Sequence, residues 1–141
     1  MEIAQAEVGM VLDFGDGSQI EILTVNNNGM VLLLTWYDFF ALLPMDMDFD
    51  NLDDLKDIPN LTNISVYLLP DSGYSPLSPP EWINRLSPNL AILSGSASDS
   101  DGFPYFDTMS ILESTPTFRT DQCGWIEVTT DGHQMWVEIG H

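Results

Sequence analysis

Residues 26–46 read NNNGMVLLLTWYDFFALLPMD, and this stretch decides the fold. It contains two apolar runs, each short enough for one strand, with only Tyr37-Asp38 between them. The triple Asn followed by Gly29 is a strong turn signal before the first run, and Pro44 closes the second. Runs that are apolar on both faces are typical of strands in the middle of a layered structure. The stretch therefore predicts a central hairpin over residues 26–43, in which four side chains are nearly inaccessible to solvent: Val31, Leu33, Phe39 and Leu42.

The flanking segments predict the rest of a layered sheet. Gly9–Phe14 and Gln19–Val25 are strand-like, and the Asp16-Gly17 dipeptide between them is typical of a hairpin turn. Beyond the central hairpin, the pattern predicts a helix with Leu52, Leu55 and Ile58 on its inner face and then a strand over Val66–Leu69. A helix capped by Ser78 and running to Leu86 follows, and then a strand over Leu90–Leu93. The last predicted elements are a helix over Tyr105–Glu113, an extended piece over Thr117–Thr120, and a hairpin of Trp125–Thr129 with Gln134–Ile139. Strands with helices on one outer face indicate the α/β class. We expect a single domain over residues 1–141, built as a mixed β-sheet half-sandwich with outer helices.

The chain is strongly acidic. It has 22 Asp and Glu but only 3 Lys and Arg, which gives a formal net charge of −19. With 44% hydrophobic residues it has enough apolar material for a core, so the charge does not indicate disorder. Such a field repels nucleic acid and anionic lipid, and we expect no direct nucleic-acid binding and no membrane contact by this segment. The main interpretation of this charge is a halophilic or simply acidic surface, and the charge also favours cations or basic partners.

The residue types that usually carry catalysis are scarce. Cys123 is the single cysteine, which excludes an internal disulfide, and it has no base beside it. His133 and His141 are not spaced as metal ligands. These residues therefore predict no catalytic residue and no cofactor. The compartment stays open, because the chain has no signal peptide and no run of ~18 apolar residues, yet it could be a piece of a longer, membrane-anchored protein.

An acidic run follows the central hairpin and has some features of a calcium loop. Its oxygen-bearing residues fall at offsets close to those of an EF-hand: Asp46, Asp48, Asp50, Asn51, Asp54 and Asp57. Two residues depart from that pattern, since Asn51 stands in place of the turn Gly and Asp57 in place of the bidentate Glu. No helix enters the run from residues 42–44. We interpret it as the solvated face of a short helix, with a weak calcium site as the alternative.

The order of motifs resembles the second half of the metallo-β-lactamase fold, and more narrowly the C-terminal domain of ComEC-type proteins, which act in DNA uptake. The similarity covers about Gly9 to Val137. It depends on a series of short matches in the family's order: Asn26-Asn27-Asn28 before an apolar strand, Leu42-Leu43-Pro44-Met45-Asp46 at the end of the next, Pro70-Asp71-Ser72-Gly73-Tyr74, Ser87-Pro88-Asn89-Leu90-Ala91-Ile92-Leu93-Ser94, Gly102-Phe103-Pro104 and Phe118-Arg119-Thr120-Asp121-Gln122-Cys123-Gly124.

The resemblance implies a metal site from which the ligands have been lost. In the family a binuclear centre uses a bridging carboxylate, a histidine pair and a later histidine from this half of the fold. The matching positions here are Asp46 for the carboxylate, Asp71 and Ser72 for the pair, and Phe103 for the last histidine. The His-x-His-x-Asp-His run of the family's first half is missing from this chain. The resemblance therefore implies a non-catalytic relative with a structural or interaction role.

Two other functions stay open. One is a metal-dependent hydrolase or nuclease whose ligands come from a missing N-terminal segment or a partner chain. The other is an acidic interaction module for a basic partner. A half-sheet leaves an apolar face or strand edge unprotected, so we also expect a homodimer or contact with the remainder of a longer chain.

Overall fold

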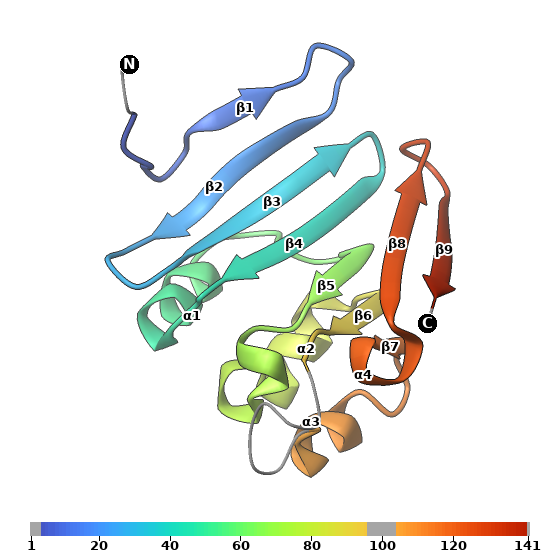
Figure 1. Ribbon diagram of the computed structural model, residues 1–141. Helices are drawn as coiled ribbons and strands as arrows, with labels where there is room; N and C mark the ends of the chain where they lie inside the picture. Colours follow the sequence, from blue (N-terminus) through green and yellow to red (C-terminus); the bar gives the residue numbers. More distant parts are fainter. Residues whose placement is uncertain (1–3, 96–103, 141) are drawn as a thin grey trace.

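The computed structural model describes residues 4–95 and 104–140. Its main feature is a seven-stranded mixed sheet whose spatial order follows the chain (Figure 1). The strands are β1 (Val11–Asp13), β2 (Gln19–Val25), β3 (Met30–Trp36), β4 (Phe39–Met45), β5 (Val66–Leu68), β6 (Leu90–Leu93) and β7 (Thr117–Arg119). Strands β1 to β4 form an antiparallel meander, and β4 to β7 are parallel. The predicted mixed α/β class is therefore confirmed.

The central hairpin forms as predicted. Strands β3 and β4 pair from Met30 opposite Met45 to Trp36 opposite Phe39, across the two-residue turn at 37–38. Val31, Phe39 and Leu42 are buried, with exposed fractions of 0%, 7% and 0%. The expectation for Leu33 is wrong, because its side chain is only half-buried. Leu33 lies on the helix-bearing face, but it lines a groove beside β2 that the helices leave open.

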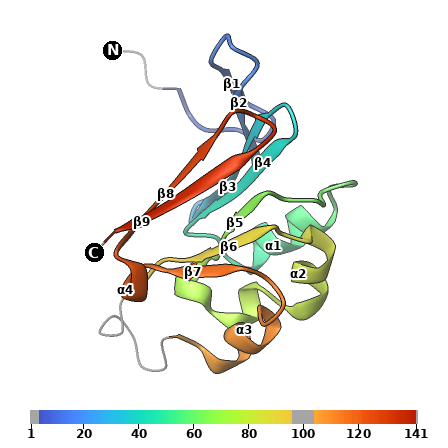
Figure 2. The same ribbon diagram turned by 90° about the vertical axis from the view of Figure 1, so that its right-hand side faces the viewer.

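Three helices cover one face of the sheet: α1 (Phe49–Lys56), α2 (Pro80–Leu86) and α3 (Phe106–Ile111) (Figure 2). Each lies in a connection between neighbouring parallel strands, which must cross over the sheet to restart in the same direction. Of the inner-face residues predicted for the first helix, Leu52 and Leu55 are buried in one core with Leu42 and Tyr67, and Ile58 is partly buried against it. Helix α2 adds Trp82, Ile83 and Leu86 to the same core. Two single 3₁₀ turns, Asp71–Gly73 and Ser75–Leu77, precede α2.

Two details of the helices differ from the prediction. Ser78 does not cap α2; Pro79 takes that position, and the Ser78 hydroxyl lies 3.1 Å from the Tyr67 hydroxyl. Tyr67 is completely buried, so its hydroxyl needs an internal partner, and burial raises its pKa to about 12. The extended piece expected through Thr120 ends at Arg119, and a short helix, α4 (Thr120–Cys123), follows it.

The predicted terminal hairpin, β8 (Trp125–Thr130) with β9 (Met135–Gly140), covers part of the other face of the sheet. Its apolar side chains pack against a second core cluster formed by β4, β5 and β6. This cluster contains Phe39, Ala41, Val66 and Leu90, with Val128, Met135 and Val137 from the hairpin. The β4–β6 region is therefore buried from both sides, which explains why its strands have no polar alternation.

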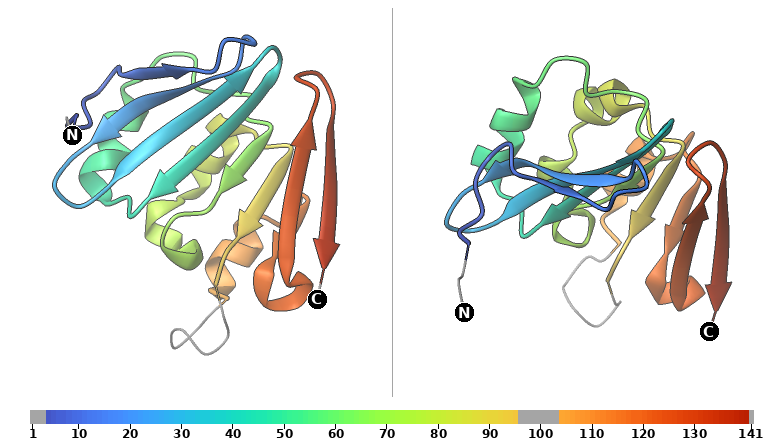
Figure 3. Two further views of the ribbon diagram at one scale, coloured as in Figure 1. Left: turned by 45° about the horizontal axis from the view of Figure 1, so that its top comes forward. Right: turned by 90° about the horizontal axis from the view of Figure 1, so that it is seen from above.

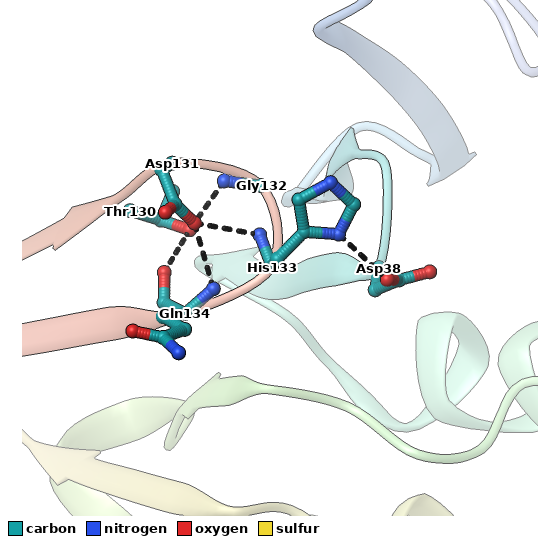
Figure 4. Close-up of polar contacts among 6 residues, drawn as sticks. All are labelled: Asp38, Thr130, Asp131, Gly132, His133 and Gln134. Atoms are coloured by element: carbon teal, nitrogen blue, oxygen red, sulfur yellow. Dashed lines mark hydrogen bonds and ion pairs between the residues drawn. The ribbon is translucent and has the colours of Figure 1, made fainter.

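The tip of this hairpin is clamped to the β3–β4 turn (Figure 4). The Asp38 backbone N–H donates to the Gly132 carbonyl over 2.9 Å, and the His133 ring nitrogen Nδ1 lies 2.8 Å from the Asp38 carboxylate. The Tyr37 ring stacks on His133 with centroids 5.1 Å apart. Within the tip, the Thr130 and Asp131 side chains hold the turn by accepting backbone N–H groups. The clamp joins two turns that are about a hundred residues apart in the sequence.

The hairpin does not extend over strands β1 to β3 (Figure 3). Cross-strand pairing places Leu12, Ile20 and Leu34 on one face of the sheet, and Ile22 beside Leu32 on the same face. Several apolar side chains on this face belong to neither core cluster, and six of them make up what we call the open face: Leu12, Ile20, Ile22, Met30, Leu32 and Met45. Leu12 and Met45 at its margins are 60% and 50% exposed.

A buried polar network attaches α1 to β2. A β-bulge between Ile22 and Thr24 turns Thr24 from the open face toward α1. The completely buried Asn51 amide donates to the Thr24 hydroxyl over 3.2 Å, and that hydroxyl donates to Asp54 over 3.0 Å. The Asn51 side-chain oxygen also accepts the backbone N–H of Asp48 over 3.0 Å.

Replacing Asn51 by Ala leaves the Thr24 hydroxyl and the Asp48 N–H without these partners. We expect a loss of about 1–3 kcal/mol in the free energy of unfolding, measured by urea denaturation. The matched control is Asn84→Ala, because Asn84 is exposed on α2. Equal urea midpoints for the two variants would show that the network does not stabilise the fold.

Candidate functional site

The carboxyl ends of β4, β5 and β6 border a shallow depression of about 370 Å³. Parallel strands end at the same edge of a sheet, which is where α/β proteins commonly bind ligands. The depression contains Asp46 from the end of β4, Asp71 and Ser72 from the turn after β5, and Ser94 from the end of β6. Three of the four positions that the resemblance singles out therefore lie together. The fourth, Phe103, is outside the described residues.

The backbone is unusual at the same three residues. Asp46, Asp71 and Ser72 have φ angles of 52°, 45° and 49°, in the left-handed region that few residues other than glycine adopt. Such conformations cost free energy and often cluster at functional sites. No glycine or Asn-Gly pair stands at these three positions, so the left-handed backbone was not predicted from the sequence. It directs attention to the depression as the candidate site.

The polar groups of the depression restrict its chemistry. Two carboxylates and two hydroxyls offer oxygen atoms only, a set that suits a hard cation such as Ca²⁺ or Mg²⁺ with much retained water. Zinc sites of catalytic type are built mainly from histidine and thiolate ligands. Over residues 4–95 and 104–140, no three His, Cys, Asp or Glu side chains come close enough together to hold a metal ion.

The acidic run after β4 forms a helix, so its carboxylates have separate roles. Asp48 is the N-cap of α1 and accepts the Asn51 N–H over 3.0 Å, while Asp54 accepts the Thr24 hydroxyl. Asp50 is exposed in the first turn of α1, and Asp57 is exposed at its C-cap. Only Asp46 of this run borders the depression.

The triple Asn has a second function besides making a turn. Asn26 accepts the backbone N–H groups of Asn28 and Gly29, which closes the β2–β3 turn. The side-chain amides of Asn26 and Asn28 then donate to the two Asp48 carboxylate oxygens over 2.9 and 2.7 Å. Gly29 packs so closely that a Cβ atom there would lie 2.2 Å from the Asp46 carbonyl oxygen. Asp48 also forms a capping box with Asn51, the third residue of α1.

These hydrogen bonds lower the pKa of Asp48. The largest cause is the Asn28 side-chain amide, followed by the Asn51 backbone N–H. Since the folded pKa lies below the ordinary value of 3.8, ionised Asp48 stabilises the fold above that value. The contribution is lost as the pH falls through the folded pKa.

We therefore expect Asp48→Asn to reduce the difference between the urea midpoints at about pH 5 and about pH 3. Asp53→Asn is the control, because Asp53 is exposed on the same helix and removes the same charge. The Asp48 carboxyl carbon should titrate below the ordinary value in an NMR pH series. An equal pH response of both variants would contradict the assignment.

No helix in the described parts of the chain is long and apolar enough to cross a membrane. Comparisons of the chain with protein-family models, with curated proteins and with solved structures gave no match. The relation to the metallo-β-lactamase fold therefore stays a prediction that depends on the order of the sequence motifs and on their spacing.

Proposed function

We propose that this chain is a non-catalytic α/β interaction domain, related to the metallo-β-lactamase-like domain of ComEC-type competence proteins, that binds a basic protein partner. One observation carries the proposal: the sheet is covered unequally. Helices protect one face and a hairpin protects β4 to β6 on the other. The apolar side chains of the open face belong to neither core cluster; Leu12 and Met45 are exposed, and the other four are half-buried.

The edge of the sheet beside the open face is also unprotected. Strand β1 has no neighbour on its outer side among the described residues. Its segment exposes five large apolar side chains, Val8, Met10, Val11, Leu12 and Phe14, by 40–64%. Exposed apolar strand edges tend to pair with other chains, and contiguous apolar patches of this kind mark interaction surfaces.

The charge distribution supports a basic partner. Every charged residue before Lys56 is Asp or Glu, so β1 to β4 contain no cationic side chain. The two arginines of the chain are engaged elsewhere: Arg85 donates to the carbonyls of Lys56 and Ile58, and Arg119 pairs with Asp121 over 2.6 Å. A second copy would bring another 19 negative charges to the same surface. A cationic protein would instead gain from long-range attraction.

The absence of hydrolytic activity is the first test. We expect only background phosphodiesterase rates with zinc or manganese, because the depression offers oxygen ligands without histidine. Zinc titration by calorimetry should show no site tighter than the high-micromolar range. A stoichiometric zinc at Asp46, abolished by Asp46→Asn, would favour the alternative that this chain is part of a hydrolase completed by other segments.

Partner binding is the second test, with the extended peptide acetyl-Thr-Val-Arg-Val-Thr-amide as the probe. We expect salt-sensitive NMR shifts in residues 8–36, and weaker binding of a peptide with Glu in place of Arg. Leu12→Asn should reduce the affinity, whereas Phe106→Asn should not, because Phe106 is 82% exposed on α3 behind the other face. Shifts that change with protein concentration and an increasing mass in light scattering would show that a second copy covers the surface instead.

A further inference from the structure

A groove of about 350 Å³ lies beside β1 on the helix-bearing face of the sheet. Helix α1 does not reach this part of the sheet, so strands β2 and β3 form the floor and residues 58–61 form one wall. Most of the lining is apolar, including Val8, Leu23, Leu33, Ile58 and Leu61. A site of this size falls at the lower end of small-ligand pockets and accommodates one long side chain.

One charged residue, Glu21, lines the groove. Its backbone pairs with Val11 on β1 and Leu33 on β3, so its side chain lies between apolar neighbours and is half-buried. The two ion pairs found in the described residues, Arg119 with Asp121 and His133 with Asp38, do not involve Glu21. Nor does the Glu21 side chain form a hydrogen bond within the described part of the chain.

The half-buried Glu21 carboxylate has no side-chain partner among the described residues. A cation from outside the chain would supply one. Lys and Arg suit such a groove best, since their aliphatic stems pack on apolar surface while the charged end forms a charge-assisted hydrogen bond. The free edge of β1 lies directly beside the groove and offers backbone groups to an extended segment.

We propose that the groove binds a Lys or Arg side chain of the basic partner, presented by an extended segment that lies along the free edge of β1, with Glu21 as the carboxylate that receives it. This assignment rests on the proposed function and names the chemistry by which the partner is recognised. It places specificity on the helix-bearing side of β1, and the open face on the other side contributes apolar contact area.

The experiment compares Glu21→Gln with Glu81→Gln, which removes the same charge from an exposed position on α2. The probes are acetyl-Thr-Val-Arg-Val-Thr-amide and the same peptide with Gln in place of Arg, titrated by NMR. For the Arg peptide we expect amide shifts at residues 8–9, 21–23 and 58–61, and an affinity about fivefold to tenfold lower for Glu21→Gln. Glu81→Gln should bind like the unchanged protein, and the Gln peptide should bind all three proteins weakly and equally.

Stability provides a second measurement that needs no ligand. Because Glu21 is unpaired in the groove, Glu21→Gln should leave the urea midpoint unchanged or raise it. A clear decrease would mean that Glu21 has a stabilising partner within the chain, and the assignment would be wrong.

The results separate this assignment from the proposed function. If the Arg peptide binds to residues 8–36 but Glu21→Gln has no effect on its affinity, the partner docks elsewhere on the β1–β3 region and only the groove assignment fails. If the Arg peptide binds no better than the Gln and Glu peptides to any variant, the basic-partner function fails as well.

Discussion

The β3–β4 hairpin is apolar on both faces, so each face must be covered by another layer. On one side the crossover helices supply that layer, because parallel strands after β4 oblige the chain to return across the sheet. On the other side, within residues 4–95 and 104–140, the covering layer is the two-stranded hairpin β8–β9 over β4 to β6. Because the hairpin covers less of the sheet than the helices do, the apolar open face over β1 to β3 lies outside both core clusters.

The hairpin is held at both ends by different means. At its base it follows α4 directly, through Gly124 with a φ angle of 71°. At its tip it depends on Asp38, Tyr37 and the close approach of Gly132, where a Cβ atom would lie 2.6 Å from the Tyr37 ring. The β3–β4 turn therefore connects the central strands and also fixes the position of the second layer.

The acidic charge takes several forms in the structure. Asp48 is used to cap α1 and to receive two Asn side chains, and Asp54 completes a buried network. Asp46 and Asp71 lie at the carboxyl ends of β4 and β5. Glu21 lies in the groove beside β1, on the helix-bearing face of the sheet. An excess of one charge is therefore no guide to a single site, because each carboxylate meets a different local environment.

The sequence by itself determined the order of the elements and the inner faces of the helices, because apolar spacing reports burial within one segment. The central hairpin, the inner residues Leu52, Leu55 and Leu86, and the terminal hairpin followed from this. It also pointed to Asp46, Asp71 and Ser72 through the resemblance alone. Only the tertiary structure decided how far the hairpin covers the sheet, that Leu33 and Glu21 face an open groove, that Ser78 meets Tyr67, and that the candidate residues adopt left-handed backbone. These properties depend on distances between segments far apart in the chain, and such distances leave no local periodicity to read.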